Sequence, residues 1–411
     1  MMHSKADAQK RVKEGSLSRR DWIVLPLISL LTIGVLTVST EAMGTLLFPR
    51  AGNAIAGCIV ANDPSAGVHG KPDSVCVHRL SEGPPIEYRF NSCGDRAGME
   101  CGAKPPGTYR IVMAGSSIAM GFGAPIENTI AAQLSPQLSL RTGRRVEVYN
   151  KGLDWVFPPT VDLRFKHVLA DQPDMVLWII TPIDVARTFP TSNDDITGPA
   201  GTTGLPPGQR PGFLRKAWAG MNAQFAGKSI PDALSAIADE TRTVFLIRHF
   251  MYESQSLFVQ SYLLGGDDAG FLKSQPSEEW QGRLQHIDAY AADMAKQARA
   301  AGVPLVVVLV PNRAQASMIS MGKWPAGFSP YKLDDELRNI ATSHGATYVD
   351  ILQGFRGIPN PEQYFLPADG HPNDQGYSIL SGLLANALTN GSVPDLREEP
   401  QPPATQLTAR R

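Results

Sequence analysis

Short apolar runs that end in turns recur along the C-terminal three quarters of the chain. The runs at 109–114, 175–180 and 304–310 are apolar almost throughout, which is typical of strands buried on both faces. Shorter runs at 146–150 and 346–351 have the same character. Because segments with helical spacing lie between these runs, the pattern predicts an α/β domain over 108–392, with a mainly parallel five-stranded sheet between two helical layers. The predicted helices are at about 127–142, 160–170, 278–301, 333–344 and 373–389.

Two segments do not fit this alternation. The insertion at about 188–277 interrupts it: 190–212 is rich in Pro and Gly and predicts a loop, whereas 230–265 predicts helix. Either a packed helical excursion or a mobile lid over a substrate is compatible with this composition. The proline-containing tail at 393–411 predicts disorder.

The N-terminal apolar run has about the length of a membrane-spanning helix. Residues 22–39 are 18 residues without a charge, close to the roughly 20 that cross a bilayer core. A second apolar segment, 42–48, continues past Glu41. Since Lys and Arg outnumber Asp and Glu in 1–21, the positive-inside rule places that segment in the cytoplasm and the remainder outside. We expect a retained transmembrane anchor at 22–47; a cleaved signal peptide is the alternative.

The four cysteines all fall in the segment that follows, 48–107, which is rich in Gly and Pro and contains one strand-like piece at 86–90. An even number of cysteines in an exported lead-in predicts disulfides, with three possible connectivities. Sequential pairing closes the shortest loops and is the expected one. A zinc site does not fit, because there is no Cys-x-x-Cys and no partnering His pair. The expected pairs are Cys58–Cys76 and Cys93–Cys101.

Charge and motifs exclude several function classes. The net charge of −1, with no long basic run beyond the N-terminus, gives no reason to expect nucleic acid. No Gly-rich phosphate loop of the P-loop type occurs, so we expect no cofactor. The histidines other than His371 lack metal-ligand spacing, so we also expect no metal.

Residues with catalytic chemistry follow the first predicted strand and recur near the C-terminus. Ser117 comes directly after 109–114, and Asp369 and His371 come after the last strand. The loops at the carboxyl ends of parallel strands open on one edge of the sheet, where ligands bind. Each signal alone is more often a helix cap or a surface turn. Together they predict a serine nucleophile, a histidine base and an aspartate that fixes its tautomer.

These residues resemble the motifs of the SGNH (GDSL-type) hydrolase superfamily, over about 86–188 and 278–390. Ser117 matches the family's nucleophile, and Asn150-Lys151-Gly152 resembles the block whose glycine donates a backbone N–H to the oxyanion hole. The resemblance implies a flavodoxin-like SGNH fold and acyl transfer through an acyl-enzyme. Further matching positions are Gly121, Gly123, Asp369, His371, Pro372, Asn373 and Gly376.

Two positions depart from the family pattern. Ser116 stands where the family has Asp directly before its serine, and Ile183 stands where the family has the Asn that donates to the oxyanion. Losing one oxyanion donor typically slows the reaction by about 10²–10³. The backbone N–H groups of Ser117 and Gly152 remain as donors, and Thr181 is a partial substitute.

Arg313 and Gln315 follow the fourth predicted strand and are candidates to line the substrate site; ordinary loop solvation is the alternative.

The sequence therefore predicts a single-pass protein of the bacterial inner membrane with a periplasmic or otherwise extracytoplasmic SGNH-like domain. The expected activity is serine-dependent hydrolysis of acyl esters. The expected substrate is an acylated carbohydrate of an envelope polysaccharide, or another small ester, and polysaccharide machinery of the envelope is a candidate partner. If a sugar hydroxyl replaces water as acceptor, the chain is an O-acyltransferase. A catalytically inactive carbohydrate-binding or assembly protein is the alternative from another class.

Overall fold

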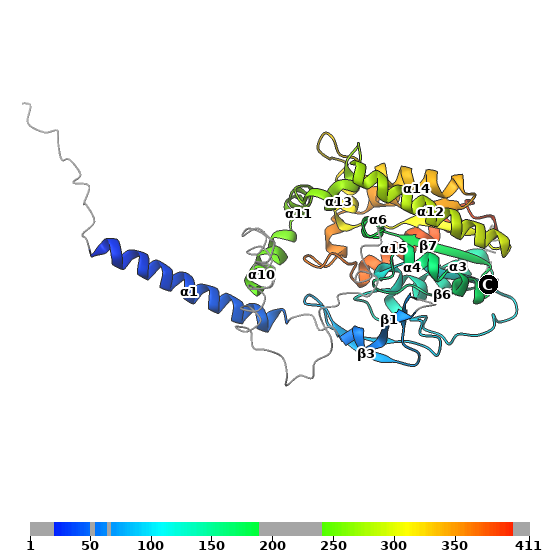
Figure 1. Cartoon of the computed structure of the whole chain (residues 1–411), viewed down its shortest axis with the longest axis horizontal. Coiled ribbons are helices and arrows are strands. Elements are labelled where there is room, and N and C mark those ends of the chain that lie inside the picture. The colour runs from blue at the N-terminus through cyan, green and yellow to red at the C-terminus, as the bar shows by residue number, and fades with distance from the viewer. Residues whose placement is uncertain (1–19, 50–53, 64–66, 189–240, 398–411) are drawn as a thin grey trace, which may run out of the picture. The chain divides into compact units, whose positions relative to one another are not determined.

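The computed structural model describes residues 20–49, 54–63, 67–188 and 241–397 (Figure 1). The chain divides into two compact units. One consists of Met1–Pro49 and Gln224–Leu246, and the other of Arg50–Ala223 and Ile247–Arg411. The predicted loop at 190–212 and the first part of the predicted helix at 230–265 lie outside the described residues.

The first unit contains α1 (Asp21–Leu47), the one helix in the described part of the chain that is long and apolar enough to cross a membrane. Its 27 residues correspond to about 40 Å at 1.5 Å per residue, more than the roughly 30 Å of a hydrocarbon core. Near its C-terminal end, the Glu41 carboxylate accepts hydrogen bonds from the backbone N–H groups of Arg242 (2.6 Å) and Thr243 (3.1 Å). Glu41, the charged residue that interrupts the apolar run, therefore caps the start of α10 (Arg242–Tyr252).

The second unit is built on a five-stranded sheet in the order β6-β5-β7-β8-β9, with every neighbouring pair parallel. All residues of β5, β7 and β8 are buried, which is why these runs are continuously apolar rather than alternating. This confirms the predicted α/β fold with a flavodoxin-like strand order. The strands are β5 (Thr108–Ala114), β6 (Arg145–Asn150), β7 (Met175–Ile180), β8 (Leu305–Leu309) and β9 (Thr347–Val349).

Helices form two groups around this sheet. One group contains α3 (Ile130–Thr142) and α15 (Asp374–Thr389), which pack against each other. In the other group, α12 contacts the remaining crossover helices, as right-handed crossovers on the opposite face require. These helices are α4 (Pro158–Leu163), α5 (Phe165–Ala170), α6 (Pro182–Ala186), α12 (Glu278–Ala300) and α14 (Lys332–Ser343).

Several short elements were not predicted. They include α2 (Ser117–Met120) and α13 (Arg313–Met321), whereas α10 and α11 (Gln255–Leu263) fall within the helix predicted at 230–265. Of the tail predicted to be disordered from Val393, the structure describes residues 393–397, and the side chains of Val393 and Leu396 are buried, contrary to the prediction. The rest of the predicted tail lies outside the described residues. The 3₁₀ turns are η1 (Ala54–Cys58), η2 (Ile126–Asn128), η3 (Gly266–Leu272), η4 (Leu352–Gly357), η5 (Pro361–Tyr364) and η6 (Pro394–Leu396).

The cysteine-containing lead-in forms two antiparallel hairpins, where the sequence predicts a single strand. Cys58 is bonded to Cys76 and Cys93 to Cys101, which is the expected sequential pairing. The first disulfide ties η1 to a strand of the second hairpin. The hairpins are β1 (Ile59–Asp63) with β2 (Gly67–Gly70), and β3 (Val75–Arg79) with β4 (Pro85–Arg89).

Candidate active site

The candidate nucleophile stands at the turn that follows β5, the strand between β6 and β7. Gly115 has φ +152°, and a Cβ there would lie 2.6 Å from the backbone oxygen of Ile179, so the chain can turn this closely beside β7 only with glycine. Ser117 is the first residue of α2, and it is only 8% exposed. The turn therefore holds its hydroxyl at the carboxyl edge of the sheet, as predicted from the strand pattern.

The C-terminal loop brings a histidine and an aspartate to this hydroxyl across 254 residues of sequence. His371 Nε2 lies 2.8 Å from Ser117 Oγ, and His371 Nδ1 lies 2.7 Å from Asp369 Oδ1. In the tautomer with the proton on Nδ1, the ring donates to Asp369 and accepts from the Ser117 hydroxyl. The structure thus brings together the three residues that the sequence predicts for catalysis.

The loop itself is closely hydrogen-bonded. The Leu366 N–H donates to the His371 carbonyl (2.8 Å), and the Gly370 N–H donates to the Leu366 carbonyl (2.9 Å). Gly370 has φ +86°, a left-handed conformation that glycine adopts without strain. Three residues after Gly370, Asn373 caps α15 by accepting from the Gly376 N–H (3.0 Å). The ring of Phe122 packs 4.8 Å from the His371 ring, centroid to centroid.

The two charged partners shift each other's pKa values. The side chains of His371 and Asp369 are 25% and 28% exposed. Partial burial acts to lower the pKa of His371, but the hydrogen bond and charge of Asp369, helped by the charge of Asp154, outweigh it and raise that pKa. Partial burial acts to raise the pKa of Asp369, but its hydrogen bonds with His371 and the charge of His371 lower it. The pair therefore favours an imidazolium next to a carboxylate.

Asp154 is a residue near the site that the sequence analysis missed. Burial raises the pKa of Asp154 to about 6, while the charge of His371 acts to lower it. The Asp154 N–H lies 3.4 Å from the Met120 sulfur at the end of α2, so the loop after β6 packs onto the helix of the nucleophile. No motif marks this residue; only the folding of that loop brings its carboxylate near His371.

The two backbone N–H groups predicted to form the oxyanion hole, those of Ser117 and Gly152, differ in their hydrogen bonding. The Ser117 N–H lies at the first position of α2, where backbone N–H groups have no acceptor within the helix, so it can donate to a substrate oxygen. The Gly152 N–H instead donates to Asn150 Oδ1 (2.9 Å). Gly152 is still required, because a Cβ there would lie 2.5 Å from the Met120 nitrogen. Ile183, which stands where the sequence resemblance would expect an asparagine, is 48% exposed, and its side chain has no hydrogen-bond donor.

Thr181 is the predicted partial substitute for the missing asparagine. Its N–H and its hydroxyl both donate to Asp184 Oδ2 (2.7 Å each), which forms a capping box at the start of α6. Burial raises the pKa of Asp184 to about 6, and Ser116 and Thr181 act to lower it. The contribution of Thr181 to the oxyanion hole stays a prediction, and in this structure both of its donors are used by Asp184.

Arg313 and Gln315 were expected to line the substrate site, and the structure places both in packed interior instead. The guanidinium of Arg313 lies 4.0 Å from the ring centroid of Phe258, and its Nη1 donates to the Pro367 carbonyl (2.8 Å). Gln315 is fully buried, and its Nε2 donates to the Pro330 carbonyl (2.6 Å). The strand-end position suggested a substrate contact, but α13 begins here and turns these side chains inward.

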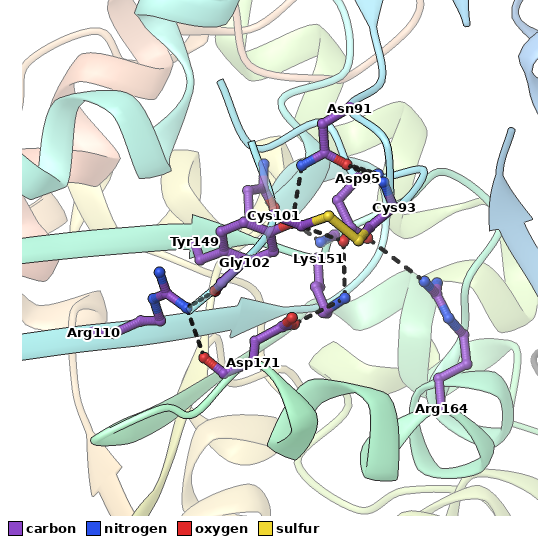
Figure 2. Close-up of polar contacts among 12 residues, drawn as sticks. Asn91, Cys93, Asp95, Cys101, Gly102, Arg110, Tyr149, Lys151, Arg164 and Asp171 are labelled. Carbon is purple, nitrogen blue, oxygen red and sulfur yellow. Dashed lines mark hydrogen bonds and ion pairs between the residues drawn. A yellow bond between two sulfur atoms is a disulfide. The ribbon is translucent and has the colours of Figure 1, made fainter. Parts of the chain in front are cut away.

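A buried polar cluster holds the lead-in against the loop that carries Gly152 (Figure 2). Lys151 Nζ lies 2.8 Å from Asp95 Oδ2 and 2.9 Å from Asp171 Oδ2. Tyr149 donates its hydroxyl to Asp95 (3.0 Å) and accepts from the Asn91 amide (2.9 Å). Because Asp95 lies between Cys93 and Cys101, the disulfide-closed loop is attached directly to the end of β6.

Within the described ranges, no group of three or more His, Cys, Asp or Glu side chains is arranged to hold a metal ion. Independently of this, Ser117 supplies a hydroxyl, His371 an imidazole that can take its proton, and Asp369 a carboxylate that orients the imidazole. This arrangement supports proton transfer and nucleophilic attack by side chains.

No protein-family model matches the chain, and no curated protein is a significant match to it. Solved structures do match at low identity. A putative lipolytic protein of the G-D-S-L family from Desulfitobacterium hafniense DCB-2 is 13% identical, over 68% of this chain and 99% of its own, with a TM-score of 0.30. A catalytic mutant of an acetylxylan esterase from Geobacillus stearothermophilus is 13% identical, over 71% and 96%, with a TM-score of 0.36. The protein TesA is 14% identical, over 68% and 98%, also with a TM-score of 0.36.

Proposed function

We propose that the chain is a serine-dependent acyl ester hydrolase with Ser117 as nucleophile, His371 as general base and acid, and Asp369 as the residue that orients His371. The observation that carries this proposal is the continuous relay from Asp369 Oδ1 to His371 Nδ1 (2.7 Å) and from His371 Nε2 to Ser117 Oγ (2.8 Å). Both distances are those of hydrogen bonds through which a proton can move.

The reaction follows from this geometry. His371 Nε2 removes the hydroxyl proton as Ser117 Oγ forms a bond to the acyl carbon, and the charge moves to the acyl oxygen. The Ser117 N–H donates to that oxygen, and Asp369 stabilises the imidazolium. The ester bond then breaks and Nε2 gives its proton to the departing alcohol. Water, which loses a proton to Nε2, next attacks the acyl carbon of the acyl-enzyme. The bond from that carbon to Ser117 Oγ breaks, Nε2 returns its proton to Oγ, and a carboxylic acid is released.

The oxyanion hole of this site is weaker than the family pattern implies, because Ile183 provides no donor. The Gly152 N–H becomes a second donor only when the substrate oxygen replaces Asn150 Oδ1 as its acceptor. Each missing donor typically costs about 10²–10³ in rate. We therefore expect slow turnover on simple esters.

We further propose that α1 is retained as an anchor in the bacterial inner membrane, with the catalytic domain outside the cytoplasm. The length and apolar composition of α1 support this placement, as do the two disulfides, which persist in oxidising compartments. In that compartment the proposed substrate is an acylated envelope polysaccharide, and machinery that builds or modifies that polysaccharide is the proposed partner.

Turnover of 4-nitrophenyl acetate and of an O-acetylated polysaccharide by the purified full chain tests the activity. Ser117→Ala and His371→Ala should each lower kcat by at least about 10³-fold in folded protein. Free acetate as the main product supports the hydrolase, whereas transfer to an added sugar acceptor supports the O-acyltransferase instead. No Ser117-dependent turnover of either ester would favour the inactive binding protein.

A further inference from the structure

A buried carboxylate from the lead-in contacts the loop that bears Asp369 and His371. Glu82 lies in the turn between β3 and β4, and its side chain is only 1% exposed. Its Oε2 accepts from the backbone N–H groups of Ala368 (3.0 Å) and Asp369 (2.9 Å), and its Oε1 accepts from Ala368 as well (2.9 Å). A charged acceptor makes such hydrogen bonds stronger than those between neutral groups.

The residue before Ala368 in the same loop is held by a cation. Arg313 Nη1 donates to the Pro367 carbonyl (2.8 Å), and its other terminal nitrogen donates to the Tyr252 carbonyl. Burial lowers the pKa of Arg313 to about 10, while the charge of Glu82 acts to raise it, so the group is charged at neutral pH. Three consecutive residues, 367–369, therefore have their backbone fixed by two buried ions of opposite charge.

The remaining contact of Glu82 reaches the helical insertion. His249 in α10 places its Nδ1 2.6 Å from Glu82 Oε1. Both carboxylate oxygens of Glu82 therefore have partners, from the catalytic loop and from α10. A surface carboxylate would gain little from such bonds, but a buried one that lost them would carry an unsatisfied charge.

We propose that Glu82 is a positioning residue for catalysis, which fixes Asp369 and, through it, the orientation of the His371 ring toward Ser117. This inference rests on the proposed function. The carboxylate does not contact the reacting atoms. It holds the backbone from which Asp369 projects, and Asp369 in turn accepts from both Nδ1 (2.7 Å) and the backbone N–H (3.2 Å) of His371. A small displacement of this backbone moves Nε2 away from the hydroxyl.

Kinetics of Glu82 variants of the full chain on 4-nitrophenyl acetate test this role. Glu82→Ala should lower kcat by about 10²-fold with KM unchanged, because a 1 Å misplacement of a catalytic group costs about that factor. Glu82→Gln should retain most of the activity. Its carbonyl oxygen can occupy the Oε2 position and accept both N–H groups, while its NH₂ faces His249. Glu82→Asp, retracted by one methylene, should give an intermediate kcat.

Glu87→Ala is the matched control, since Glu87 lies on the same hairpin but forms an exposed ion pair with Arg89 (2.7 Å). Its kcat should equal that of the wild type. Wild-type kcat in folded Glu82→Ala or Glu82→Asp would overturn the inference. So would loss of folding in all three Glu82 variants, because Glu82 would then stabilise the whole domain. Ser117→Ala measured in parallel separates the two proposals: if it is as active as the wild type, the proposed function itself fails.

Discussion

Two carboxylates change the pKa of the His371 imidazole, one through a hydrogen bond and its charge and the other through its charge alone. Asp369 is hydrogen-bonded to Nδ1, whereas Asp154 acts through its charge from the loop after β6. Both raise the pKa of His371, and a base with a raised pKa carries its proton up to a higher pH. Since His371 must be unprotonated to accept the Ser117 proton, kcat/KM should rise as pH increases through a pKa above the ordinary value of about 6.5.

Asp154→Asn should move this acidic limb of the pH profile to lower pH. The substitution removes a negative charge that favours the imidazolium, and it keeps the size of the side chain. The measurement is kcat/KM for 4-nitrophenyl acetate across the limb, in wild type and variant. Asp171→Asn is a suitable control, because Asp171 pairs with Lys151 and is not among the groups that act on His371. An unchanged or higher midpoint in Asp154→Asn would contradict the assignment.

Ile183→Asn should increase kcat, by up to about 10²-fold, because it offers the side-chain donor that this oxyanion hole lacks. Ile183 is half-exposed at the start of α6, so a polar side chain fits there without a buried unsatisfied group. Ile183→Ala removes the branched apolar side chain without adding a donor and should leave kcat low. Equal kcat values in the two variants would show that position 183 does not face the oxyanion.

At the scale of elements, the parallel sheet follows from the sequence because buried parallel strands are continuously apolar. The order of its strands does not follow from this pattern, and only the family resemblance implied it. The lead-in hairpins do not, since their strands are short and their fold depends on disulfides and on packing against the domain. Glu82 was beyond prediction for a related reason: it binds backbone groups 286 and 287 positions away, and backbone acceptors leave no pattern in the sequence. The prediction that Arg313 and Gln315 line the substrate site failed because their position at a strand end does not reveal that a helix begins there.

The cluster between the lead-in and β6 should matter for stability (Figure 2). Asp95→Ala leaves Lys151 buried with one of its two carboxylates missing, and breaking a buried ion pair typically costs about 3–5 kcal/mol. Urea unfolding of the full chain in detergent measures the free energy. Arg89→Ala, which breaks the exposed pair with Glu87, should cost less than about 1 kcal/mol. Equal costs in the two variants would contradict a structural role for the cluster.

At the scale of the whole molecule, the proposal places the ester chemistry outside the cytoplasm. Protease added to intact spheroplasts should digest the catalytic domain and leave a membrane-bound fragment that ends near Leu47, the end of α1. N-terminal sequencing of the untreated protein separates anchor from signal peptide, because a retained anchor keeps the residues before Asp21. A domain that resists protease until the membrane is lysed would contradict the exported orientation.

Covalent labelling of the full chain with a fluorophosphonate probe, followed by mass spectrometry of the modified peptide, is the most direct measurement. The account predicts one phosphonyl adduct on the hydroxyl of Ser117, absent in Ser117→Ala and formed much more slowly in His371→Ala. A folded wild-type protein that takes up no label, or one that carries it on another residue, would contradict the claim that His371 activates this hydroxyl.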